Sequence, residues 1–165
     1  MKKLLFAVFG LCIGSSVFAE SPQVHYIKRM YKESVKLETK IRNNGLYYTL
    51  KYFDSNIRKI FARDDKYGEA TEGTTGCLDS NVLWQTNGLD PKAKLTFTEP
   101  SAGKVKVTIG ATMGLEKRSV TYQVKCQKDK NCKIIEIYED GKSFTKEMSK
   151  CLDDFYRAEF KKLSK

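Results

Sequence analysis

Hydrophobic and polar residues follow a helical period in the first part of this chain. Residues 24–42 place apolar side chains about one helical turn apart, and Asn43-Asn44-Gly45 supplies a stop, so we expect one long amphipathic helix. Asp54 is expected to cap a second, short helix that ends at Arg63. Residues 66–80 are rich in Gly and Thr and have no period, which predicts a long loop. The apolar positions of the first helix are Ile27, Met30, Tyr31, Val35 and Ile41.

From residue 92 the period changes to two, which is typical of strands with one buried face. Short polar connections between these strands favour an antiparallel meander of about four strands. The fourth strand, Cys132 to Tyr138, breaks the alternation around Ile135, so we expect a bulge or burial on both faces there. The alternating apolar positions are Ala93, Leu95, Phe97, Val105, Val107, Ile109, Val120, Tyr122 and Val124.

A closing helix is predicted after Ser143, which is placed to act as its N-cap. Its apolar stripe comprises Phe144, Met148, Cys151, Leu152 and Phe155. The predicted fold class is therefore α+β: N-terminal helices packed on a curved antiparallel meander of about four strands, with a closing C-terminal helix. A chain of 165 residues suits a single domain of this kind.

Residues 1–19 have the pattern of a cleaved signal peptide. Lys2 and Lys3 precede an apolar run over residues 4–13, and Val17-Phe18-Ala19 suits a signal peptidase. The run is too short for a retained transmembrane anchor, which needs about 20 apolar residues. Leu11 before Cys12 does not fit a lipoprotein signal. We therefore expect a periplasmic protein with one domain over residues 20–165.

Cleavage would leave four cysteines, an even number that fits two disulfides in an oxidising compartment. Three pairings are open. A polar turn separates Cys126 from Cys132, and a disulfide across that hairpin would leave Cys77 to pair with Cys151, which is the pairing we favour. Neither clustered Cys nor clustered His with zinc-type spacing is present, so no metal is expected.

The chain is basic, with 30 Lys and Arg against 20 Asp and Glu. Loss of Lys2 and Lys3 with the signal peptide lowers the net charge from +10 to +8. Such a charge favours anionic partners, namely a lipid or lipopolysaccharide surface, nucleic acid or an acidic protein. Four lysines follow one another at i, i+4 steps on the first helix and form either a solvated face or an anion-contact stripe. They are Lys28, Lys32, Lys36 and Lys40.

The segment Lys133-Ile134-Ile135-Glu136-Ile137-Tyr138-Glu139-Asp140-Gly141-Lys142-Ser143-Phe144 resembles the end of an uncharacterised periplasmic family in the nuclear transport factor 2-like (cystatin-like) superfamily. Family members carry a Trp-Lys-Ile-x-Asp-Ile strand followed by Gly and Ser opening a helix. Here Cys132 stands in place of Trp, and Glu136 in place of Asp. The resemblance spans residues 24–155 and implies a cone-shaped half-barrel whose mouth holds a ligand or is plugged by side chains.

No catalytic constellation emerges from the residue types. The only histidine, His25, lies near the expected mature N-terminus, and the cysteines are expected in disulfides, so neither a Cys-His nor a Ser-His-Asp set is predicted. Members of the superfamily that are enzymes use an Asp or His base with Tyr hydroxyls inside the cone. This chain has Tyr and acidic residues that could serve in that way, but ordinary amphipathic packing also explains them. The candidate cavity residues are Tyr48, Tyr52, Trp84, Tyr122 and Glu136.

Three functions remain open, and none requires a cofactor. The favoured one is a secreted, non-catalytic binding or accessory protein with a cone-type cavity that takes a small ligand or an anionic surface. The second is an inhibitor or immunity protein against an acidic protein partner, and the third is a small cone-type isomerase or hydrolyase. We expect a monomer, because lysines on the outer sheet face would oppose a dimer interface. These are Lys94, Lys104, Lys106 and Lys125.

Overall fold

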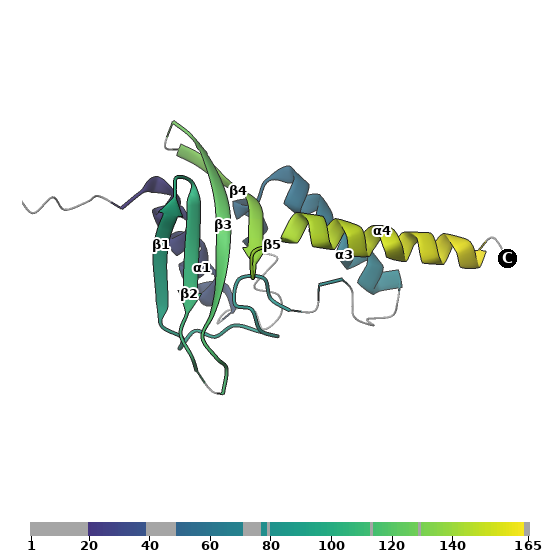
Figure 1. The fold of residues 1–165 in the computed structure, drawn as a ribbon, viewed down its shortest axis with the longest axis horizontal. Coiled ribbons are helices and arrows are strands. Elements are labelled where there is room, and N and C mark those ends of the chain that lie inside the picture. The colour runs from purple at the N-terminus through teal and green to yellow at the C-terminus, as the bar shows by residue number, and fades with distance from the viewer. Residues whose placement is uncertain are drawn as a thin grey trace, which may run out of the picture.

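The computed structural model describes residues 20–38, 49–70, 77–78, 80–112, 114–128 and 130–163. Over these residues the fold is α+β, as predicted, with three α-helices and a five-stranded antiparallel sheet (Figure 1). The elements are α1 (Pro22–Glu38), the 3₁₀ helix η1 (Leu50–Tyr52), α3 (Ser55–Ala70), β1 (Leu95–Ser101), β2 (Lys104–Ile109), β3 (Arg118–Gln127), β4 (Lys130–Glu139), β5 (Lys142–Ser143) and α4 (Phe144–Leu163). Within the described ranges, no helix is long and apolar enough to cross a bilayer. The predicted signal peptide lies outside them.

The strands form a meander in the order β1-β2-β3-β4-β5, each antiparallel to the next. The predicted bulge is present: Gln123 faces Glu136 and Val124 faces Ile134, so Ile135 is the extra residue, and it is 37% exposed. The expectation of about four strands missed β5, a two-residue strand. Asp140 and Gly141 both have positive φ (48° and 79°), and this tight turn folds the chain back onto β4.

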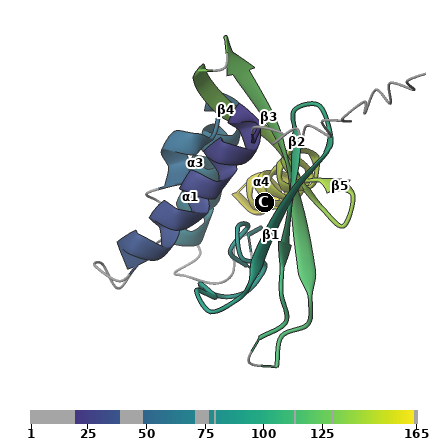
Figure 2. The same ribbon diagram turned by 90° about the vertical axis from the view of Figure 1, so that its left-hand side faces the viewer.

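Helix α1 lies across one face of the sheet and contacts β1 to β4 (Figure 2). The Ser21 hydroxyl accepts a hydrogen bond from the Val24 N–H at 3.2 Å, and Pro22 occupies the first helical position, where its missing N–H costs nothing. The helix thus begins two residues before the predicted span of 24–42. The last four residues of that span lie outside the described ranges.

Helices α3 and α4 lie side by side and project away from the β4–β5 edge of the sheet (Figure 1). As predicted, Asp54 caps α3, since its carboxylate accepts the Ile57 N–H at 2.9 Å. The predicted end at Arg63 is wrong, because α3 continues to Ala70. Packing against α4 accounts for the extra turns: Arg63 pairs with Asp153, and the ring of Tyr67 contacts that of Phe155. Residues 66–70 are therefore helical rather than part of the predicted loop.

The core between α1 and the sheet is built around Tyr31. Its ring meets those of Trp84 and Tyr122 edge-on, with centroids 5.2 and 6.3 Å away. Its hydroxyl lies 2.9 Å from the Tyr122 hydroxyl and also donates to the Leu83 carbonyl. Burial raises the pKa of both tyrosines, so their phenols stay neutral and serve as hydrogen-bonding core residues.

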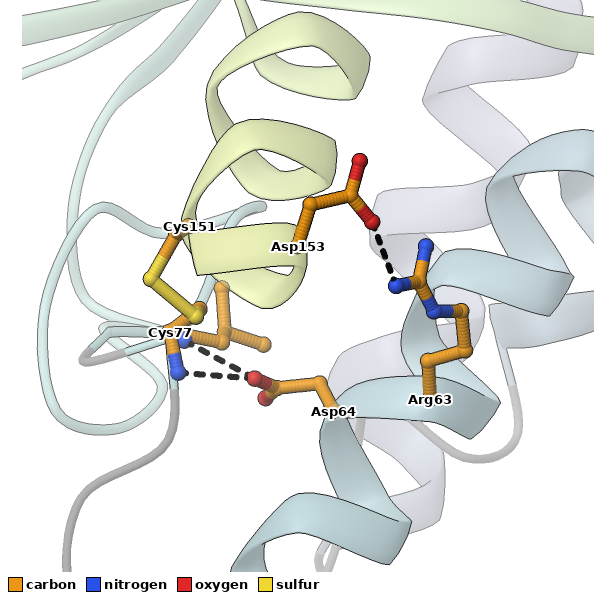
Figure 3. Close-up of a disulfide and its surroundings, with 6 residues drawn as sticks. Arg63, Asp64, Cys77, Cys151 and Asp153 are labelled. Atoms are coloured by element: carbon orange, nitrogen blue, oxygen red, sulfur yellow. Dashed lines mark hydrogen bonds and ion pairs between the residues drawn. A yellow bond between two sulfur atoms is a disulfide. The ribbon is translucent and has the colours of Figure 1, made fainter. Parts of the chain in front are cut away.

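Both cysteine pairs favoured from the sequence are disulfide-bonded in the structure. One joins Cys126 and Cys132 across the β3–β4 hairpin. The other joins Cys77, in the segment after α3, to Cys151 on α4 (Figure 3). Beside it, one oxygen of Asp64 accepts the N–H groups of Cys77 and of the next residue at 2.8 and 3.3 Å. This segment is thus held to α3 by hydrogen bonds and to α4 by a covalent bond.

Candidate functional site

Of the candidate cavity residues that the structure describes, two come together in the core and two lie elsewhere. Trp84 and Tyr122 are buried with Tyr31 in the core between α1 and the sheet. Glu136 is on β4 and its carboxylate contacts the start of α4, and Tyr52 of η1 lines a groove together with residues of α1. Tyr48 lies outside the described residues. The side chains that were expected to open into a cone thus fill the protein interior or support a helix end.

Glu136 acts as a cap for α4. Its carboxylate accepts the Thr145 N–H at 3.1 Å and the hydroxyls of Ser143 and Thr145 at 2.8 and 2.5 Å. As the sequence predicted, Ser143 is the N-cap, with its hydroxyl accepting the Lys146 N–H at 3.2 Å. The negative charge at a helix N-terminus is also favourable toward the helix dipole.

Replacing Glu136 by alanine should therefore lower the free energy of unfolding by about 1–2 kcal/mol, the usual effect of losing a helix cap. Urea unfolding monitored by the fluorescence of the single Trp would measure the change. Glu136→Gln is the matched control, because the amide oxygen still accepts hydrogen bonds, and it should cost less. If both variants lowered the free energy of unfolding equally, the hydrogen bonds would not act as a cap, and the effect would come from the charge alone.

A groove of about 970 Å³ lies between α1, η1 and the first residues of β4. We call it the α1–β4 groove. It is lined by Glu20, Pro22, His25, Tyr26, Arg29, Glu33, Lys51, Tyr52, Lys130, Asn131, Cys132 and Lys133. Its cationic side chains outnumber the two carboxylates, and they come from three elements that are distant in the sequence.

The floor of the groove is aromatic. Tyr26 and Tyr52 meet edge-on with centroids 4.9 Å apart, and the Tyr26 hydroxyl donates to the Tyr52 carbonyl at 3.1 Å. The Arg29 guanidinium lies over both rings, 5.4 and 5.7 Å from their centroids. Burial raises the pKa of Tyr26 to about 12 although Arg29 opposes the shift, so the phenol stays neutral. The stacking holds the guanidinium in place at the groove, where its positive charge and planar N–H groups suit a carboxylate or phosphate.

Glu33 and Lys51 close one end of the groove with an ion pair at 2.6 Å. Burial alone would raise the pKa of Glu33, but the Lys51 ammonium, the Tyr52 hydroxyl and Arg29 outweigh it and the net shift is downward. Burial and this carboxylate raise the pKa of Tyr52. Near neutral pH, Glu33 is thus charged and Tyr52 is neutral, so Glu33 offsets the charge of Lys51 and interacts with Arg29.

Lys130 and Lys133 form the opposite wall, at the start of β4. Both are exposed, and Lys133 donates to the Lys51 carbonyl at 2.5 Å, which ties β4 to η1. Among the described residues, neither lysine has a carboxylate within 4.0 Å. Together with Arg29 they make a site that attracts carboxylate or phosphate groups. The arrangement offers binding by charge and stacking, whereas no nucleophile-base pair is present among these lining residues.

Comparisons with known proteins identify no relative of this chain. No family model matches the chain, and no curated protein or solved structure matches it either. The geometry of the groove therefore carries the functional argument on its own.

The predicted lysine stripe lies beside the groove rather than in it. Lys28 pairs with Glu20 and lies 5.6 Å from the ring of Phe97 on β1. Lys32 and Lys36 are exposed, and Lys40 lies outside the described residues. Consecutive helical residues are about 100° apart, so Lys28 and Arg29 face different neighbours, β1 and the groove respectively.

Sequence reasoning missed most of the groove. Tyr26, Arg29 and Glu33 follow an i, i+3, i+7 pattern on α1, and this mixed aromatic and charged stripe was the available signal. The two β4 lysines were visible only as part of a polar turn. Nothing in their local pattern indicates that the β3–β4 hairpin ends next to α1.

Proposed function

We propose that this chain is a secreted, periplasmic, non-catalytic binding protein that holds an anionic ligand in the α1–β4 groove. The observation that carries the proposal is the convergence of Arg29, Lys130 and Lys133 on a groove with a tyrosine floor. Charge complementarity of this kind raises both the rate and the specificity of binding. Two disulfides support secretion, since they persist in oxidising compartments.

A nuclear transport factor 2-like cone, with residues 1–19 as its signal peptide, remains our proposal for the fold family. The curved meander with a helix on one face is compatible with it. In that family the cone interior is a natural ligand site, but here Tyr31, Trp84 and Tyr122 fill the space between α1 and the sheet and are each no more than 1% exposed. Binding is therefore assigned to the surface groove instead of the interior.

The proposal is tested by titrating the protein with citrate and with pyrophosphate while recording amide NMR spectra. The largest shifts are expected for residues of α1 and the start of β4. The substitution Lys130→Glu reverses one charge of the groove. An attraction to the anion of about 1 kcal/mol is lost and a repulsion of about the same size takes its place, so the affinity for citrate or pyrophosphate should fall at least about tenfold.

Two variants serve as matched controls. Lys106→Glu reverses another exposed charge, on the face of the sheet opposite α1, and Lys32→Glu reverses one on the lysine stripe of α1. Both should retain most of the affinity. If Lys32→Glu weakened binding as much as Lys130→Glu, the stripe rather than the groove would be the anion site. If neither anion bound at low salt, the proposed function would be wrong.

A further inference from the structure

The first residues of β4 line the α1–β4 groove along the side of the strand that does not face β3. On one side β4 pairs with β3, and on the other its partners are β5, at Tyr138 and Glu139, and Phe53, at Ile134. Among the described residues, no strand or bridge partner covers that second side between Lys130 and Lys133. The edge is part of the groove wall, since these four residues line it.

The direction of the backbone groups on this edge follows from the structure. The Ile134 carbonyl accepts the Asp54 N–H at 2.9 Å, so the polar groups of Ile134 point away from β3. Lys133 is directly opposite Lys125 of β3. Because alternate residues of a strand direct their N–H and C=O to the same side, those of Cys132 also point away from β3, toward the groove. A donor and an acceptor of the main chain thus face the site.

The chain itself shows what such an edge accepts. Phe53 and Asp54 form an extended segment that pairs with β4 in parallel at Ile134. Before Phe53 the chain turns into η1 and leaves the line of the edge, so the described part of the chain does not continue this pairing to Cys132, which is 6% exposed and lines the groove. An extended segment from another molecule in that position would continue a pairing that the fold already contains.

We propose that the α1–β4 groove binds a short, extended acidic peptide segment of a partner protein, whose main chain pairs with β4 at Cys132. This inference rests on the proposed function and names its ligand. The edge recognises a peptide backbone, as in strand addition to an exposed sheet edge. The peptide's carboxylates are held by Arg29, Lys130 and Lys133, two of which are edge-strand lysines that pair with no carboxylate in the described part of the chain.

The lysines also explain why the open edge is tolerated in the free protein. Exposed edges invite pairing with other copies of the same chain, and lysines on an edge oppose it. A second copy would bring Lys130 and Lys133 against their own equivalents, whereas an acidic segment would neutralise them. The same residues thus exclude self-association and select the partner.

The test uses acetyl-Glu-Thr-Glu-Thr-Glu-amide and its singly N-methylated variants, with binding measured by calorimetry. An added strand directs alternate amides to β4, so methylation of one alternating set should weaken binding at least about tenfold, while methylation of the other set should have little effect. The Cys132 amide should exchange more slowly with solvent in the complex. The matched control peptide, with Lys in place of each Glu, should not bind.

Each alternative outcome separates this inference from the proposed function. If the peptide binds but every N-methylated variant binds equally well, the groove binds anions without strand pairing, and only the inference is overturned. The same holds if citrate or pyrophosphate binds at the groove and the acidic peptide does not. If no anion or peptide binds, both are overturned. Sedimentation showing a homodimer with a protected Cys132 amide would replace the acidic peptide by a second copy of the chain.

Discussion

Replacing Asp90 by alanine is expected to lower the free energy of unfolding by about 3 kcal/mol, because it leaves a half-buried guanidinium without its partner. The Asp90 side chain is 6% exposed and pairs with Arg118 at 2.9 Å, while the Thr112 hydroxyl donates to the same oxygen. Arg118 also donates to the Trp84 carbonyl at 2.7 Å. The pair therefore links β3 to the loop that contains Trp84. Urea unfolding followed by Trp fluorescence would measure the change in the free energy of unfolding.

The exposed pair between Arg63 and Asp153 provides the matched control. Its side chains are 38% and 52% exposed, so Asp153→Ala should cost less than about 1 kcal/mol. If Asp90→Ala cost no more than this control, the buried pair would not stabilise the loop.

Acid should have the same effect as the Asp90 substitution. Hydrogen bonds from Thr112 and Arg118, with the nearby guanidinium charge, lower the pKa of Asp90 below its ordinary value of 3.8. A carboxyl group with a lowered pKa in the folded state contributes stability that is present above pH 3.8 and is lost as the pH falls through the folded-state pKa. Asp90→Ala should therefore lose less stability than the parent protein between pH 5 and pH 2.

The sheet was predictable from the sequence because each strand pairs with its neighbour in the chain. Alternation fixes which face is buried, and short hairpins fix the partner, so β1 to β4 needed no long-range information. The bulge at Ile135 was visible for the same reason, since an extra residue breaks the alternation. The strand β5 was not, because two residues are too short to show a period.

The misplaced end of α3 and the missed groove have a different cause. Residues 64–70 carry few apolar side chains, and they are helical because Tyr67 and Arg63 meet partners on α4, about 90 residues later in the chain. The groove likewise depends on bringing α1, η1 and the β3–β4 hairpin together. Local sequence patterns carry no information about contacts between elements that are distant in the chain. The donor and acceptor at Cys132 are backbone groups, which every residue type other than proline supplies.

Removing the Cys77–Cys151 disulfide with the double substitution Cys77→Ser and Cys151→Ser should lower the free energy of unfolding by roughly 4 kcal/mol. The bond closes a loop with a sequence separation of 74, and the entropy that cross-linking removes from the unfolded chain grows with loop length. Asp64 can still accept the N–H groups of residue 77 and of Leu78, so the segment keeps its hydrogen-bonded anchor to α3 (Figure 3). The loss should therefore come mainly from the unfolded state, with little change in the folded structure.

The second disulfide tests that explanation within the same protein. Cys126 and Cys132 have a sequence separation of only 6, so the Cys126→Ser and Cys132→Ser pair should cost about 2 kcal/mol, roughly half as much. Urea unfolding would compare the two variants, and thiol titration of the denatured, unreduced parent should find no free thiol in the mature chain. If the hairpin disulfide proved the more costly of the two, loop entropy would not be the main contribution. Disruption of the start of β4, where it lines the groove, would then be the better explanation. The variant without the Cys126–Cys132 disulfide should in that case also bind acidic peptides more weakly.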